Sequence, residues 1–170
     1  MNVQLRTCEI RPWQPDDLDS LVRHANNCKI WLNVRDRFPH PYLTKHGRAF
    51  IKSAREDGPE RPFAIVVDEA AVGGIGFVAQ PDVERVAAEV GYWLGEEYWG
   101  RGIATEALTA ITRYAIDDRR FTRLFGKVFA HNVASARVLE KAGYTLEARL
   151  RRSAIKDGEV VDQLLYGLTA

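Results

Sequence analysis

Cysteine is scarce in this chain of 170 residues, which has two, Cys8 and Cys28, and neither they nor the four histidines show metal-site spacing. No apolar run approaches the ~20 residues of a membrane span, and residues 1–4 do not begin a signal peptide. Neither charge dominates, with 24 basic and 23 acidic residues. These absences predict a reduced, cytoplasmic protein with no metal, no nucleic-acid partner and no membrane partner.

The composition is that of a folded domain. Hydrophobic residues make up 46% of the chain, enough at this length for one core. The sequence contains no internal repeat, linker or low-complexity tract. We therefore expect one domain over residues 1–170, as a monomer or homodimer.

The centre of the chain carries a strand, a glycine-rich turn and a helix. Residues 86–95 alternate, with Tyr92 and Leu94 on one side and Glu89 and Trp93 on the other. Apolar residues at helical spacing follow the sequence Trp-Gly-Arg-Gly at 99–102. A turn of this kind exposes unpaired backbone N–H groups that a phosphate oxygen can approach. The pattern indicates an anion site for a phosphorylated cofactor.

Three other interpretations of the glycine turn were weighed. A P-loop requires Gly-Lys-Ser/Thr, a triplet that this chain lacks. A Rossmann turn requires a third glycine, and Thr105 occupies that place. A turn that only caps a helix remains open at this point.

A second strand and helix follow. Residues 121–130 alternate like a strand, Asn132 suits a helix N-cap, and Gly143 suits the helix end. Elsewhere the pattern predicts a strand over 9–13, helices over 18–25 and from Thr44, and an irregular segment over 29–43. It also predicts hairpins joining 61–67 to 72–79, and 144–155 to 159–168 around the Asp157-Gly158 turn.

The two strand–helix pairs resemble the general N-acetyltransferase (GNAT) superfamily, and within it the Rim-type ribosomal-protein N-terminal acetyltransferases. The resemblance runs from Leu5 to Leu168. It implies an α/β fold with a central mixed, mostly antiparallel sheet flanked by helices. The fourth and fifth strands, here 86–95 and 121–130, would be splayed apart, with Gly91 and Gly95 as candidate bulge positions.

The same resemblance implies that acetyl-CoA binds between the splayed strands. Its pantetheine would pair with the backbone of Tyr92, Trp93 and Leu94, and Asn132 would also contact it. Its pyrophosphate would lie on the turn and first helical residues, with the dipole assisting. The expected cofactor residues there are Trp99, Gly100, Arg101, Gly102, Ile103, Ala104 and Thr105.

Catalysis requires an oxyanion stabiliser, a proton donor for the thiolate and a deprotonated amine. The resemblance points to an amide near Leu94 for the oxyanion and to Ser135 as the acid, since Leu139 replaces the tyrosine used elsewhere in the superfamily. Ala154 replaces the Rim-type glutamate base. Glu89 is the substitute candidate, ahead of three weaker ones (Asp36, Glu147 and Asp162). An N-terminal amine also has a neutral fraction near pH 8 that needs no base.

The acceptor is expected under the aromatic segment 30–43, through Trp31, Arg35, Asp36, Phe38 and Tyr42. The predicted activity is transfer of acetyl from acetyl-CoA to a primary amine, a peptide N-terminus or a small molecule. The first alternative is a non-catalytic acyl-CoA-binding or regulatory module, motivated by Leu139 and Ala154. The second is a nucleotide-binding protein unrelated to CoA.

Overall fold

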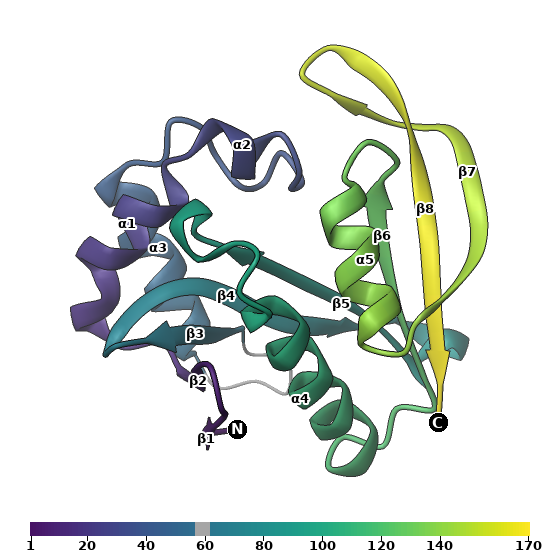
Figure 1. The fold of residues 1–170 in the computed structure, drawn as a ribbon, viewed down its shortest axis with the longest axis horizontal. Coiled ribbons are helices and arrows are strands. Elements are labelled where there is room, and N and C mark those ends of the chain that lie inside the picture. The colour runs from purple at the N-terminus through teal and green to yellow at the C-terminus, as the bar shows by residue number, and fades with distance from the viewer. Residues whose placement is uncertain (57–61) are drawn as a thin grey trace.

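A computed structural model describes residues 1–56 and 62–170 and places them around one eight-stranded sheet with helices on both faces (Figure 1). The strand order is β1-β2-β3-β4-β5-β6-β8-β7, and the pairs are antiparallel except β5–β6. The strands are β1 (Val3–Gln4), β2 (Glu9–Pro12), β3 (Phe63–Val67), β4 (Ala70–Ala79), β5 (Ala87–Leu94), β6 (Arg123–Phe129), β7 (Thr145–Lys156) and β8 (Glu159–Thr169).

Five α-helices and three short 3₁₀ turns connect these strands. The α-helices are α1 (Leu18–Ala25), α2 (Cys28–Trp31), α3 (Thr44–Arg55), α4 (Ile103–Asp117) and α5 (Val133–Lys141). The 3₁₀ turns are η1 (Pro15–Asp17), η2 (Asp82–Glu84) and η3 (Glu96–Tyr98). Among the described residues, no helix is both long enough and apolar enough to cross a membrane.

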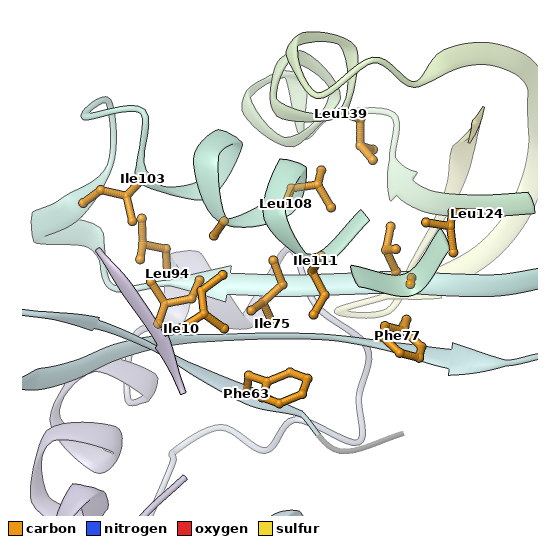
Figure 2. Packing of buried hydrophobic residues seen from close by; sticks show 14 of the residues in the cluster. Ile10, Phe63, Ile75, Phe77, Leu94, Ile103, Leu108, Ile111, Leu124 and Leu139 are labelled. Carbon is orange, nitrogen blue, oxygen red and sulfur yellow. The ribbon is translucent and has the colours of Figure 1, made fainter. Parts of the chain in front are cut away.

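The sheet is covered by hydrophobic side chains on both faces. One cluster joins Ile75 and Leu124 of the sheet to Leu108 of α4 and Leu139 of α5 (Figure 2). The other joins Trp13, Leu21 of α1 and Ile51 of α3 on the opposite face. Burial of these side chains holds α4 and α5 on one face and α1 and α3 on the other, because each helix has one apolar stripe.

The prediction of a mixed sheet with two splayed strands is confirmed. The predicted bulge is wrong, because the β4–β5 register continues without a shift past Gly91, and the Gly95 amide extends the ladder by donating to the Val72 carbonyl at 2.7 Å. The wedge opens instead because β6 leaves β5 and pairs with β8 over its whole length.

The other predicted elements occur near their expected positions, with two differences. Segment 29–43 was predicted to be irregular, yet α2 forms because the Asn27 side chain accepts hydrogen bonds from the amides of Lys29 (2.8 Å) and Ile30 (3.3 Å). The strand predicted from Arg61 is observed from Phe63, and Arg61 itself lies outside the described residues.

Candidate active site between two diverging strands

The central feature of the site is a wedge between β5 and β6. The two strands pair only at residues 87–89 and 123–125. Beyond these residues β5 stays paired with β4 on its other side, and β6 stays paired with β8. Figure 1 shows the resulting V, with α2 on one side of its mouth and the β7–β8 hairpin on the other. Two ordered strand edges therefore face each other across an opening.

The hydrogen bonds of the β4–β5 ladder fix which backbone groups face this opening. The Gly95 amide donates to Val72, and at the other end the Gln80 amide donates to Ala87 at 2.9 Å. Since an antiparallel ladder alternates strictly, every odd-numbered residue from 87 to 95 directs its N–H and C=O toward β4. The backbone groups of residues 90, 92 and 94 consequently point into the wedge. The Trp93 backbone bonds to β4, so the expectation that it pairs with pantetheine is wrong for this residue.

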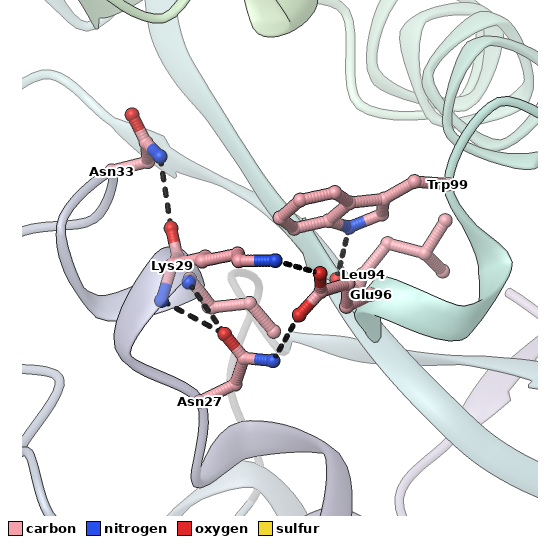
Figure 3. Close-up of polar contacts among 7 residues, drawn as sticks. Asn27, Lys29, Asn33, Leu94, Glu96 and Trp99 are labelled. Atoms are coloured by element: carbon pink, nitrogen blue, oxygen red, sulfur yellow. Dashed lines mark hydrogen bonds and ion pairs between the residues drawn. The ribbon is translucent and has the colours of Figure 1, made fainter.

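One of these groups already has a partner. The indole of Trp99, which follows η3, donates to the Leu94 carbonyl at 2.7 Å (Figure 3). The Leu94 amide and both backbone groups of Tyr92 remain directed into the wedge. Trp99 was predicted to contact the cofactor, and its indole here fixes the orientation of the Leu94 peptide.

A polar cluster ties the start of α2 to the turn before α4. The Glu96 carboxylate accepts from the Asn27 amide at 2.8 Å and from the Lys29 ammonium (Figure 3). Those hydrogen bonds, the one from Lys29 first, lower the pKa of Glu96 below its ordinary value. Asn33 continues the contact by donating to the Lys29 carbonyl at 2.9 Å. The segment over the mouth of the wedge is thereby anchored to the glycine turn.

The glycine turn presents helix α4 to the same opening. Gly100 and Gly102 have φ values of 75° and 79°, and a Cβ on either would meet nothing within 4 Å. Gly102 is the N-cap of the 15-residue helix α4, whose first amides have no partners within the helix. The Ile103 side chain is buried, and the Arg101 guanidinium lies over the Tyr98 ring at 5.2 Å. The turn therefore leaves the amides at the start of α4, those of Ile103, Ala104 and Thr105, without partners in the helix, beside open space at the two glycines.

Across the wedge, the hydroxyls of Ser135 and Tyr92 lie 2.7 Å apart. The Asn132 side chain caps α5 by accepting from the Ser135 amide at 3.1 Å, as predicted from its position. Burial raises the pKa of Tyr92 to about 12, so this phenol stays protonated at neutral pH. Sequence reasoning assigned Tyr92 only a backbone role. A role for its side chain could have been inferred from the alternation of β5, which places Tyr92 on the same side of the strand as Leu94.

Glu89 lies on the opposite face of β5, with Gly91 and Trp93. Its side chain is 18% exposed and pairs with the Arg35 guanidinium. The adjoining Gly91 is exposed, and a Cβ built there would meet nothing within 4 Å, so the space beside Glu89 is open. Trp93 beyond it contacts Phe38 with ring centroids 5.6 Å apart. Segment 31–43 thus contacts β5 on both sides of an open position at Gly91.

The three weaker base candidates are all held in ion pairs. Asp36 accepts from Lys156 at 2.8 Å, Asp162 from Arg149 at 2.7 Å, and Glu147 pairs with Arg123. Leu139, at the position of the superfamily's tyrosine, is buried in the core. Glu89 is itself paired with Arg35, so ion pairing does not set it apart from these three; it differs from them in lying on β5 beside the open space at Gly91.

The predicted acceptor residues separate into two groups. Arg35 and Asp36 line a cavity of about 250 Å³ at the wedge mouth. Trp31 lies against Lys156, whose ammonium is 4.0 Å from the indole centroid. Tyr42, in contrast, is 4% exposed and packs in the second core cluster, where burial raises its pKa to about 12. Its position corrects the expectation that it lines the acceptor site, and Phe38 packs between it and Trp93.

Comparison with known proteins gives consistent results. The acetyltransferase (GNAT) domain family matches residues 8–145. The uncharacterized N-acetyltransferase p20 of Bacillus licheniformis is 31% identical over 163 residues, covering 94% of this chain and 90% of the relative. The ribosomal protein uS5-alanine N-acetyltransferase of Escherichia coli K12 is 31% identical over 164 residues, covering 92% of this chain and 81% of the relative.

Solved structures share the fold. The ribosomal L7/L12 alpha-N-protein acetyltransferase RimL, solved in complex with coenzyme A, superposes with a TM-score of 0.87 at 21% identity, covering 99% of this chain and 98% of that one. RimJ of Mycobacterium smegmatis, in complex with CoA-disulfide, superposes with a TM-score of 0.84 at 24% identity, covering 96% of this chain and 82% of that one. At these identities the likeness establishes the architecture alone.

Proposed function

This chain belongs to the acetyltransferase (GNAT) family and is an N-acetyltransferase, and on that premise we propose that it moves acetyl from acetyl-CoA directly onto a primary amine. The amine is that of a protein N-terminus or a small molecule. The observation that carries this proposal is the wedge, in which unpaired β5 backbone, a helix N-terminus and the Ser135 hydroxyl converge.

The residues present fit coenzyme A. An extended pantetheine arm has amide groups that can pair with the backbone of Tyr92 and Leu94 as an added strand would. Its pyrophosphate would be held by the amides at the start of α4, where Gly100 and Gly102 leave space for close approach. Asn132 would keep its capping bond and contact the arm with its remaining amide hydrogens.

In the proposed reaction the amine nitrogen attacks the thioester carbonyl, and the C–N bond forms as the C–S bond breaks. The Leu94 amide would stabilise the oxyanion. It belongs to the Trp93–Leu94 peptide, which the β4–β5 ladder holds, while the Trp99 hydrogen bond holds the adjoining Leu94–Gly95 peptide. Ser135 would give its proton to the departing thiolate, yielding CoA and the acetylated amine, and would regain a proton from water as Glu89 returns the amine proton to water. If Tyr92 donates to the Ser135 oxygen, the serine hydrogen is free to point at sulfur.

Glu89 would receive the proton that the amine loses, either directly or through water. The open space at Gly91 gives an acceptor room to reach this carboxylate. Arg35 neutralises Glu89 until the ammonium of the acceptor replaces part of that contact. A peptide N-terminus requires less of this help than a lysine ε-amine, because its pKa is near 8 rather than about 10.4.

The test couples CoA binding to turnover. We expect the wild-type protein to bind acetyl-CoA by calorimetry and to release free CoA thiol when peptides or small amines are added. Ser135→Ala should bind CoA normally while kcat falls about a hundredfold, as loss of a general acid does. Ser53→Ala on the exposed face of α3 is the matched control. Binding without turnover on any amine would instead favour a non-catalytic acyl-CoA module.

A further inference from the structure

The cavity at the wedge mouth has an excess of positive charge. We propose that it binds a carboxylate carried by the acceptor, so that the enzyme prefers amines with an acidic group close to the nitrogen. This inference rests on the proposed function, since it names the substrate class of the same site. The carboxylate belongs either to an acidic side chain near a peptide N-terminus or to a free amino acid.

The cavity lies between segment 31–43 and the strands β6, β7 and β8. Its volume is about 250 Å³, and its lining consists of Arg35, Asp36, Lys127, Phe129, Ala154, Ile155, Lys156 and Gln163. Ala154 contributes only a methyl group to this lining, so Asp36 is the one carboxylate among its described residues.

The charges of the lining do not cancel. The carboxylate of Asp36 is held by Lys156, whose side chain is 2% exposed, so these two groups neutralise each other. Arg35 is shared with Glu89, which lies outside the lining. Lys127 has no carboxylate within ion-pair distance among residues 1–56 and 62–170; its ammonium lies over the Phe125 ring, 5.6 Å from the centroid. The Lys127 ammonium, which has no carboxylate partner among the described residues, and the Arg35 guanidinium, which is paired with Glu89, therefore face the cavity.

The uncharged polar group of the lining also favours an anion. The Ser153 hydroxyl lies 3.2 Å from the Gln163 side-chain oxygen and 2.9 Å from the Leu150 carbonyl, and its single hydrogen is shared between these two acceptors. The amide hydrogens of Gln163 are left as donors. The remaining walls, Phe129 and Ile155, are apolar. A ligand with a second positive charge would face Lys127 and Arg35 with no free carboxylate to receive it. A carboxylate would receive a charge-assisted hydrogen bond from Lys127.

The register of the sheet relates this cavity to the amine. Glu89 is paired directly with Phe125, and Lys127 follows two residues later on the same face of β6. Two residues of strand span about 7 Å. An acceptor with its ammonium at Glu89 would therefore place a group one or two residues away beside Lys127. The two opposite charges would also fix the direction in which the acceptor lies.

The test uses peptides that differ only at the second residue, Asp, Asn or Lys, together with free glutamate. We expect kcat/KM to be highest for the Asp peptide and about tenfold lower for the Lys peptide. Lys127 attracts the Asp carboxylate and repels the Lys ammonium, and each effect is modest because the site is partly exposed. Lys127→Met should lower kcat/KM about fivefold for the Asp peptide and leave the Asn peptide unchanged. Lys52→Met on α3 is the matched control and should change neither. A higher rate with free glutamate than with the Asp peptide would identify the small molecule as the source of the carboxylate.

A binding measurement separates this inference from the proposed function. Titration of the Asp and Asn peptides into the protein saturated with CoA reports the cavity without any turnover. Turnover of all peptides at equal rates would overturn the inference and leave the acetyltransferase proposal intact. Tighter binding of the Asp peptide that Lys127→Met abolishes, without turnover, would uphold the inference and overturn the reaction. Equal, Lys127-independent binding without turnover would overturn both.

Discussion

The hydroxyl oxygens of Tyr92 and Ser135 lie 2.7 Å apart, although the residues belong to β5 and α5, on opposite sides of the wedge. The Tyr92 hydroxyl also lies 3.1 Å from the Ser135 carbonyl, so its single hydrogen has two acceptors, and the proposed reaction requires the shorter contact, to the Ser135 hydroxyl. A phenol with a pKa of about 12 keeps its hydrogen throughout the assay range. Tyr92 is therefore suited to position the serine, and it need not change protonation state to do so.

Tyr92→Phe removes this hydrogen bond and little volume. We expect kcat to fall about fivefold, the value of one neutral hydrogen bond, while CoA affinity stays near that of the wild type. Steady-state kinetics beside calorimetry of CoA binding would measure both. Tyr114→Phe, which alters a partly buried ring of α4 in the core, is the control. An equal loss of kcat in both variants would show that the Tyr92 effect is general destabilisation.

Sequence patterns located this site better than they described its chemistry. Alternation over 86–95 and the glycines at 100 and 102 predicted the strand, the turn and helix α4, because these signals are local. Helix α2 was missed since four residues give no periodicity, and its formation depends on the Asn27 cap. The wedge itself was predicted from family resemblance, since alternation does not say where two paired strands separate.

Contacts between residues far apart in the chain could not be predicted from the sequence. Tyr92 and Ser135 are 43 positions apart, and Asp36 and Lys156 are 120 apart. Neither pair has a periodic or motif signature, because each contact is made by the packing of different elements. The cavity charge could not be predicted for the same reason: Lys127 and Arg35 face one space only once segment 31–43 lies over the sheet.

Trp99→Phe tests the fixed orientation of the Leu94 peptide. Phenylalanine keeps a ring but loses the N–H that bonds the Leu94 carbonyl. We expect kcat to fall about fivefold and the free energy of unfolding to fall by about 1 kcal/mol, for one lost hydrogen bond. Urea denaturation and steady-state kinetics measure the two effects. Unchanged kcat with lowered stability would limit Trp99 to a structural role.

Gly102→Ala tests the anion site of the turn. Gly102 has a φ of 79°, so alanine would be strained by about 1 kcal/mol and its methyl would extend into open space. We expect CoA affinity to fall about tenfold or more, because the methyl blocks close approach of the pyrophosphate. Isothermal titration of CoA is the measurement.

A matched control for Gly102 exists in the β7–β8 turn. Gly158 has a φ of 78° and equally open surroundings, so Gly158→Ala carries the same backbone strain outside the glycine turn. It should lose similar stability and keep wild-type CoA affinity. If Gly158→Ala weakens CoA binding as much as Gly102→Ala, the loss comes from backbone strain and the turn is not the pyrophosphate site.

Glu106 on α4 gives a pH-dependent test of how the N-terminal strands are held. Its carboxylate accepts from the amides of Arg6 at 3.0 Å and Thr7 at 2.9 Å, and from the Thr7 hydroxyl. Burial tends to raise the pKa of Glu106, but these hydrogen bonds outweigh it and hold the pKa below its ordinary value. The ionised form is therefore the one that the folded state stabilises.

The sign of the pH dependence follows from that lowered pKa. The stabilisation is complete above the pKa of the unfolded chain and disappears as pH falls through the lower pKa of the folded state. We expect the free energy of unfolding of Glu106→Gln to be about 1 kcal/mol lower than that of the wild type at pH 7. This difference should shrink below about pH 4. Urea denaturation at several pH values measures this, and Glu84→Gln, an exposed carboxylate of η2, should show no such difference. If the difference in free energy of unfolding between Glu106→Gln and wild type stays constant down to pH 3, the carboxylate charge does not contribute to the contact.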